Sequence, residues 1–366
     1  MLAGACSPAP SEAPAPSEAP ETATASSETP VNPQITDATI VKESFESPRT
    51  PDDNVDSVAF WQDPTDTSAS DNAGGWLLAT SKATHILNVY NAADGTLVRT
   101  VATPGAELGQ LQRPNGIAVV DNVAMVVERD NHRVQVFSLP ALESLGVFGE
   151  DVLRRPYGLT VRTLDNGYDI FVTDNYETPE EEIPPPAELD ERVKHFRVSI
   201  NDGGIHAELV ASFGETEGDG VLSKVESIAI DPATEELLIA DEHEGEMSVK
   251  VYSTAGTFTG REIGLGVFSA EAEGIGLFAC GDGGYWVITD QHKDRSRFHV
   301  FTRPEGEHLG AFAGETTANT DGVWLTQTPT ALFPNGSFYA VHDDQSVTAF
   351  DWTAIASALS LNATCE

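Results

Sequence analysis

The sequence predicts an all-β protein, a six-bladed β-propeller of four-stranded antiparallel blades, and three observations support this prediction. From Ala38 onward one pattern recurs roughly every 40 to 70 residues: an apolar segment near glycine, a segment ending in acidic residues, and a third reading V-x-V-[FY]. These β-branched and aromatic runs are separated by Gly, Asn and Asp, which is typical of antiparallel strands. Long helical periodicity is absent. Two packed sandwiches would not give every unit the same internal order.

Six units can be read along the chain. The clearest contains GIAVV, AMVVERD, RVQVFSL and ESLGVFG over residues 116–149. The others are, in chain order, SVAFWQDP to LVRTVAT, GLTVR to AELVASFG, ESIAID to SVKVYS, GIGLFAC to HLGAFAG, and GVWLTQTP to VTAFDW. The last unit shows only three strands. We therefore expect residues 39–45 (TIVKESF) to supply its fourth strand and to fasten the ring.

The N-terminal region has a different composition. Ala3, Gly4 and Ala5 precede Cys6, as at the end of a bacterial lipoprotein signal, so residues 1–6 are interpreted as a signal remnant with a lipid anchor at Cys6. A chance cluster of small residues is the alternative. Residues 7–37 are rich in Pro, Ser, Glu and Ala, which predicts a disordered tether before a propeller domain over 38–366. We expect an extracytoplasmic monomer, either secreted or a cell-surface or periplasmic lipoprotein.

Charge limits the possible partners. The chain has 20 Lys and Arg against 58 Asp and Glu, a formal net charge of −38, which repels nucleic acid at long range. Nucleic acid is therefore excluded as an expected partner. So many carboxylates need bound divalent cations or a salty medium nearby. Beyond Cys6, Cys280 and Cys365 either pair in an oxidising compartment or remain two buried thiols.

An acidic, proline-rich insertion lies within the third unit. Residues 176–192 read YETPEEEIPPPAELDER, a composition that predicts a projecting surface loop. A lid over one face of the protein is the alternative interpretation.

Acidic residues recur at the strand ends that a propeller gathers around its central channel. No nucleophile elbow, P-loop, zinc-site spacing or dinucleotide fingerprint accompanies them, and the nine histidines form no H-x-x-x-H pair. Hard oxygen ligands from several blades suit Ca²⁺, although turn and capping carboxylates would give the same pattern. Those that open strands are Asp56, Glu226, Glu273 and Asp321, and those that close strands are Asp241, Glu242, Asp343 and Asp344.

Two basic residues stand at comparable strand ends. Lys82 and Arg129 would lie beside the carboxylates, which indicates a site for an anion bridged by metal, such as phosphate. The alternative is a local salt bridge of Arg129 with Glu128 or Asp130.

The segments resemble the β-propeller phytase family from about Asp52 to Ser357. The segments LLATSKATHILNVY, VVERDNHRVQVFSL, RPYGLTV and VESIAIDPATEELLIADEHEGE each resemble a family segment. The strongest resemblance is EAEGIGLFACGDGGYWVITDQHKDRSRFHVFTR, followed by NTDGVWLTQTP and LFPNGSFYAVHDDQSVTAFDW. Each motif is weak alone, and their order and spacing carry the resemblance.

This resemblance implies a Ca²⁺-dependent phosphomonoesterase that hydrolyses myo-inositol hexakisphosphate (phytate) to lower inositol phosphates and orthophosphate. Bound Ca²⁺ would neutralise phosphate and lower the pKa of water. The matched positions imply that Lys82, Arg129 and Tyr157 act on phosphate. The expected metal ligands, including Asp241 from the strand-end pattern, are Asp56, Glu226, Asp241, Glu242, Glu273, Asp321 and Asp343.

The sequence departs from the family pattern at three places. Ser57 and Val58 follow Asp56 where the family has a paired acidic opening, and Ser227 follows Glu226 where the family has glycine. Leu189 stands where the family has a lysine, and Arg192 or Lys194 is the expected substitute for phosphate binding.

Two other functions fit the same fold. RPNGIAVV and DNHRVQVF also resemble the NHL repeat, which implies a noncatalytic surface propeller that binds protein or carbohydrate. A calcium-dependent lactonase or esterase is the third interpretation, although no metal-binding spacing typical of such enzymes stands out.

Overall fold

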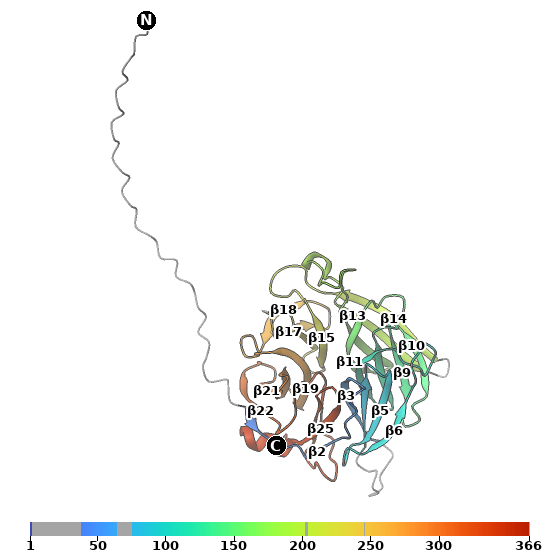
Figure 1. The fold of residues 1–366 in the computed structure, drawn as a ribbon, viewed down its shortest axis with the longest axis vertical. Helices are drawn as coiled ribbons and strands as arrows, with labels where there is room; N and C mark the ends of the chain where they lie inside the picture. Colours follow the sequence, from blue (N-terminus) through green and yellow to red (C-terminus); the bar gives the residue numbers. More distant parts are fainter. Residues whose placement is uncertain (2–37, 64–74, 202–203, 245, 366) are drawn as a thin grey trace. The chain divides into compact units, whose positions relative to one another are not determined.

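The computed structural model describes Met1 and residues 38–63, 75–201, 204–244 and 246–365. From residue 38 onward the described chain is a six-bladed β-propeller, which confirms the predicted fold class (Figure 1). The predicted lipid anchor at Cys6 and the predicted tether over 7–37 lie outside the described residues.

The first strand of every blade lines the cavity at the centre. Each blade therefore runs in chain order from the central channel outward. Blade 1 contains β3 (Val55–Trp61), β4 (Trp76–Ser81), β5 (Ile86–Asn91) and β6 (Leu97–Val101). Blade 2 contains β7 (Pro114–Val120), β8 (Val123–Glu128), β9 (Arg133–Ser138) and β10 (Ser144–Phe148). Blade 3 contains β11 (Pro156–Leu164), β12 (Gly167–Asp174), β13 (Val193–Asn201) and β14 (Gly204–Phe213).

The remaining blades follow the same order. Blade 4 contains β15 (Val225–Asp231), β16 (Glu236–Asp241), β17 (Ser248–Ser253) and β18 (Phe258–Ile263), of which β18 was absent from the sequence prediction. Blade 5 contains β19 (Glu271–Cys280), β20 (Gly283–Gln291), β21 (Arg297–Thr302) and β22 (His308–Ala313). Blade 6 contains β23 (Val323–Thr326), β24 (Ser337–His342) and β25 (Ser346–Asp351).

The N-terminal segment closes the ring across two blades. β2 (Phe45–Glu46) pairs with β25 and is the fourth strand of blade 6, as predicted. β1 (Thr39–Ile40) instead pairs in parallel with β22 and adds a fifth strand to blade 5, so the expectation that the whole segment completes one blade is wrong. Between them, the Glu43 carboxylate accepts hydrogen bonds from the backbone N–H groups of Glu315, Thr316 and Thr317. We call residues 39–46 the closing segment.

The apolar core is divided among the interfaces between neighbouring blades. One cluster joins Val127 of blade 2 to Ile170 of blade 3, and another joins Phe298 of blade 5 to Phe338 of blade 6. The second strand of a blade is therefore apolar on both faces; all six residues of β8 are buried. This explains why these strands read as near-continuous hydrophobic runs ending in one acid.

The C-terminal segment packs on the last two blades. α1 (Trp352–Leu359) begins at Asp351, whose side chain accepts a hydrogen bond from Thr353 N–H, and buries Trp352 against Phe278. Cys280 and Cys365 form a disulfide, so of the two alternatives the pair is present. Within the described residues, no helix has the length and apolarity needed to cross a bilayer.

Substitution Glu43→Gln tests the closing segment. Its hydrogen bonds lower the pKa of Glu43 from 4.5 to about 2, against burial, which acts to raise it. The stabilisation is therefore present above pH 4.5 and is lost as the pH falls towards 2. Because the side chain is half-exposed, we expect E43Q to lower the free energy of unfolding by about 1–2 kcal/mol at neutral pH. Urea unfolding at neutral pH and at acid pH measures this, and an equal loss at both would contradict the electrostatic cause.

Candidate functional site

A β-bulge stands at one end of the innermost strand in blades 1 to 5. In β3, Val55 pairs with Ser81 and Val58 with Ala79, so Asp56 and Ser57 together face one residue of β4. The same irregularity occurs in β7, β11, β15 and β19. In blade 6 the equivalent pair directly precedes β23. The first residues of these pairs are Asp56, Asn115, Tyr157, Glu226, Glu273 and Asp321.

The second residue of each pair is glycine or serine, and at the glycines neighbouring backbones almost touch. A Cβ on Gly158 would lie 2.2 Å from the Glu226 carbonyl oxygen. The backbones are also hydrogen-bonded: Gly274 N–H donates to the Asp321 carbonyl (2.9 Å), and Gly322 N–H donates to the Asp56 carbonyl (2.9 Å). These second residues are Ser57, Gly116, Gly158, Ser227, Gly274 and Gly322. The channel end that the bulges surround is called the channel mouth below.

Two further sets of side chains surround the channel mouth. In blades 1 to 4, the residue that follows the second strand donates its backbone N–H to the carbonyl of the residue two positions before the bulge. These pairs, donor first, are Lys82 with Asn54, Arg129 with Arg113, Asn175 with Arg155, and Glu242 with Lys224. Blades 2 and 3 therefore contribute arginines to the mouth, and blade 4 contributes a glutamate and a lysine.

The acidic side of the mouth consists of Glu226, Glu242 and Glu273. One carboxylate oxygen from each lies within 4.8 Å of the other two. Glu242 Oε2 is 2.7 Å from Lys224 Nζ, whereas Glu242 Oε1 is buried and has no hydrogen-bond partner among the described residues. Oxygens of one Ca²⁺ shell, each at about 2.3–2.6 Å from the ion, have such separations. The spacing and the unpartnered oxygen both fit a divalent cation.

Lys82 lies between the acidic residues of blades 1 and 6. Its Nζ is 2.8 Å from Asp56 Oδ1 and 3.7 Å from Asp321 Oδ2, and it donates to Tyr157 Oη at 3.4 Å. The Tyr157 hydroxyl donates to Asp56 Oδ1 at 3.1 Å, and burial followed by the charges of Asp56 and Glu226 raises the pKa of Tyr157. Tyr157 therefore lies between the acidic side and Lys82, Asp56 and Asp321, which are called the Lys82 group below.

The arginine side of the mouth consists of Arg113, Arg129 and Arg155. Arg129 pairs with Asp130 (2.8 Å), the local salt bridge that the sequence left open, and Arg155 pairs with Glu177. Burial, followed by the charges of Arg129 and Arg113, lowers the pKa of Arg155, so both of these arginines lie close enough to Arg155 to repel it. Arg113 Nε and both amide atoms of Asn115 are buried without partners among the described residues. Arg113 and Asn115 therefore retain unused hydrogen-bonding capacity on this side, whereas Arg129 and Arg155 are already paired with carboxylates.

Burial and the closeness of like charges shift the pKa values of the charged side chains at the mouth. Burial, followed by repulsion from neighbouring carboxylates, raises the pKa values of Glu242 and Glu273 well above their usual range. The pKa of Asp321 is also raised well above normal by burial, although Lys82 opposes the shift. Burial alone would lower the pKa of Lys82, but Asp56 and Asp321 outweigh it and raise the pKa. A cation is thus favoured here electrostatically.

Asp241 lies beside the mouth but is saturated with hydrogen bonds. Its carboxylate accepts from the backbone N–H groups of Ser223 and Lys224 and pairs with Lys250 at 3.3 Å. Asp174 and Asp290 hold their own blades in the same way. The acid at the end of a second strand thus fixes the backbone before the bulge of its own blade, which leaves it no oxygen free for a metal.

Asp343 was an expected metal ligand, but its neighbour Asp344 is the carboxylate that lies near Lys82. Asp343 is about half exposed and contacts Arg49 (3.9 Å) and Gln345 (3.0 Å), away from the acidic side. Asp344 instead accepts a hydrogen bond from Asn319 Nδ2 (3.1 Å), and its pKa is raised by burial, with the charge of Lys82 opposing the shift and that of Asp56 adding to it. A one-residue shift in a turn with two left-handed residues decides which carboxylate joins the Lys82 group.

Arg192 and Lys194, the expected substitutes for a phosphate-binding lysine, are buried and engaged elsewhere. Arg192 donates to the carbonyls of Tyr176 (2.7 Å) and Leu222 (3.2 Å), so it fastens the 176–192 loop to blade 4. Lys194 pairs with Glu191 at 3.2 Å.

Three charged residues at the mouth were missed by sequence analysis. Arg113, Arg155 and Lys224 each stand two positions before the first residue of a bulge. The signal was present in the repeated dipeptide Arg-Pro, which precedes Asn115 in blade 2 and Tyr157 in blade 3.

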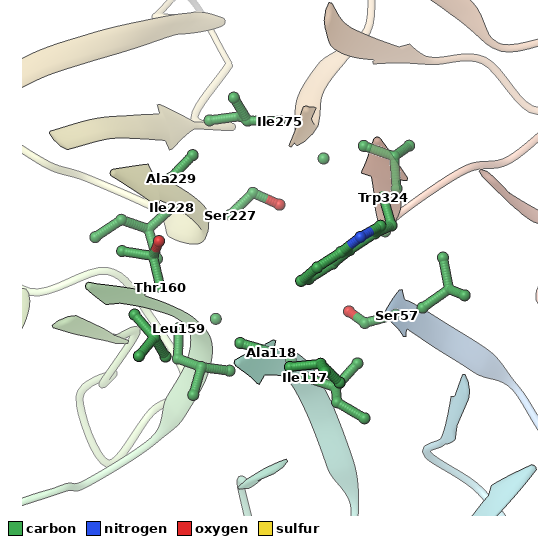
Figure 2. A pocket seen from close by; sticks show the side chains of 18 residues that line it. Ser57, Ile117, Ala118, Leu159, Thr160, Ser227, Ile228, Ala229, Ile275 and Trp324 are labelled. Atoms are coloured by element: carbon green, nitrogen blue, oxygen red, sulfur yellow. The ribbon is translucent and has the colours of Figure 1, made fainter. Parts of the chain in front are cut away.

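The channel continues beyond the bulges into a cavity of about 180 Å³. Figure 2 shows the hydroxyls of Ser57 and Ser227 and the indole of Trp324 pointing into it. Aliphatic side chains such as Ile117 and Ile275 line much of the remainder, so the charged groups are confined to the mouth.

Comparison with known proteins gives a limited match. Residues 111–137 match the NHL repeat family. No curated protein matches the chain. The fold is similar to a chain in the crystal structure of the nidogen/laminin complex, at 16% identity over 73% of this chain and 86% of that one (TM-score 0.48). It is also similar to hydrazine synthase from Kuenenia stuttgartiensis, at 12% identity over 90% and 82% of the two chains (TM-score 0.48). The chain is a β-propeller with an NHL repeat.

The raised carboxyl pKa values predict how stability depends on pH. Protonated Glu242, Glu273 and Asp321 favour the folded state below their unfolded pKa values, near 4, and this contribution is lost as the pH rises through the folded values. In chelator, we expect the melting temperature to decrease as the pH rises from about 5 to about 8. We expect Ca²⁺ to restore the melting temperature most at the higher pH. Calorimetry with KCl at matched ionic strength separates binding from screening, and a melt unchanged by pH in chelator would contradict this account.

Proposed function

We propose that this protein is a calcium-dependent phosphomonoesterase that hydrolyses inositol hexakisphosphate. The observation that carries the proposal is the division of one channel mouth into an acidic side and an arginine side. A phosphate group on a multiply phosphorylated substrate needs cations around it, and a chain with a net charge of −38 offers few. Here three arginines and Lys82 are gathered beside the carboxylates best suited to hold Ca²⁺.

Glu226, Glu242 and Glu273 would hold calcium, and Asp56, Asp321 and Asp344 supply further oxygens near Lys82. Bound calcium would neutralise phosphate charge and lower the pKa of coordinated water. Lys82 Nζ is 2.8 Å from Asp56 Oδ1, and its three N–H groups allow it to donate to a phosphate oxygen while keeping this ion pair. The Tyr157 hydroxyl, beside Lys82, would be a second donor to the phosphate, because burial and nearby carboxylates raise its pKa and keep it protonated.

The arginine side suits the phosphate groups that do not react. Guanidinium groups bind phosphate oxygens in pairs, and Arg113, Arg129 and Arg155 come from neighbouring blades. An anion between them would relieve their mutual repulsion. The choice of phytate rests on the family resemblance, whose segments carry Asp56, Lys82, Tyr157, Glu226, Glu242, Glu273 and Asp321.

The NHL match favours a second candidate, a noncatalytic binding propeller. The matched residues 111–137 include Arg113 and Arg129, so an anionic protein or carbohydrate ligand could use the arginine side without chemistry. The two candidates differ in one measurable product, inorganic phosphate.

Phosphate release from phytate tests the proposal. We expect release with Ca²⁺, none in chelator, and a loss of about 10²-fold in Glu273→Gln, because removing one preorganised charged group typically costs that much. Glu208→Gln, on the exposed outer strand β14, is the matched control and should retain activity. Phytate that binds without phosphate release would favour the noncatalytic candidate.

A second prediction concerns the arginine side. We expect Arg155→Met to raise KM for phytate about ten-fold while changing KM for a phosphate monoester little, since only the larger substrate reaches both sides. Steady-state kinetics with both substrates measures the difference. An equal rise for both would place Arg155 at the reacting phosphate instead.

A further inference from the structure

Lys224 places a positive charge on the acidic side of the mouth. Its Nζ is 2.7 Å from Glu242 Oε2 and 3.3 Å from Glu271 Oε1. The side chain is about one-third exposed, and Glu271 is more exposed still. Lys224 therefore has a second carboxylate and solvent within reach if it leaves Glu242.

The position of Lys224 in its blade explains how it came to lie there. It stands two residues before the bulge, where blades 2 and 3 carry Arg113 and Arg155. In those blades the bulge residue is Asn115 or Tyr157, so the cation meets no carboxylate at that position. In blade 4 the bulge residue is Glu226, and the backbone of Glu242 is hydrogen-bonded to the Lys224 carbonyl at 3.0 Å.

The two oxygens of Glu242 have different surroundings. Oε2 is held by Lys224, whereas Oε1 is buried and unpartnered in the described part of the chain. A divalent cation among the three glutamates would be repelled by an ammonium group that stays on the same carboxylate. The lysine and the metal thus compete for the charge of one side chain.

We propose that Lys224 is a resident cation, which neutralises Glu242 in the metal-free protein and moves towards Glu271 when Ca²⁺ binds, and thereby sets the calcium affinity of the acidic side. This inference rests on the calcium site of the proposed function, although not on phosphate hydrolysis. It makes Lys224 stabilising without calcium and opposed to calcium binding.

The experiment compares wild type, Lys224→Met, Lys224→Arg and the control Lys42→Met, which removes one positive charge from an exposed position in the closing segment. Calcium affinity of the full chain is measured by titration calorimetry, and melting temperature is measured in chelator and in excess Ca²⁺. We expect K224M to bind Ca²⁺ about ten-fold more tightly, while K224R and K42M retain the wild-type affinity. We also expect K224M to melt below wild type in chelator and at or above it in Ca²⁺.

The outcomes separate this inference from the proposed function. Unchanged or weaker calcium binding in K224M, or the same loss of melting temperature in chelator and in Ca²⁺, would make Lys224 an ordinary structural residue and overturn the inference alone. A wild type that binds no Ca²⁺ at the acidic side would overturn both. Calcium binding without phosphate release would overturn only the proposed hydrolysis.

Discussion

The close approach of backbones around the channel is the constraint on which the rest of the structure depends. Six sheets can meet at one axis only if their innermost strands nearly touch, and the bulges provide the space. In four of the six blades the second residue is glycine, because the neighbouring carbonyl stands about where a Cβ would point; blades 1 and 4 have serine there. Backbone hydrogen bonds such as Gly322 N–H to the Asp56 carbonyl then join one blade to the next. The first residue of each bulge is consequently turned to the mouth, whatever its chemistry.

The charges of the mouth follow from this arrangement. Blades 2 and 3 place arginines around Asn115 and Tyr157, whereas blades 4 and 5 place glutamates within 4.8 Å of one another. Like charges are thus concentrated on each side, which is unfavourable unless opposite charges arrive from outside. Lys224 relieves part of the repulsion on the acidic side, and Lys82 does the same for Asp56 and Asp321. The same imbalance makes the mouth a candidate site for a metal and an anion together.

Sequence patterns predicted the blades well because two-sided burial makes each second and third strand strongly apolar. They missed β18, where Gly260 and charged residues interrupt the alternation. Site residues were harder to predict, since adjacent carboxylates differ in direction and not in type. Asp241 holds backbone while Glu242 faces the mouth, and Asp343 turns away while Asp344 joins Asp321. Only the pairing register and the turn geometry separate such neighbours, and neither can be read from composition. The roles of Arg192 and Lys194 likewise depend on which carbonyls and carboxylates the fold brings near.

The two residues of each bulge are constrained by different interactions. The small residue, such as Gly158, is fixed by the adjoining backbone, while the side chain of its companion Tyr157 hydrogen-bonds Lys82 and Asp56 at the mouth. Architecture and chemistry are therefore encoded at separate positions, only one residue apart. A lineage of such propellers can exchange ligands for acids, amides or phenols one blade at a time without repacking its interior, so diversification of the binding surface need not pass through unstable intermediates.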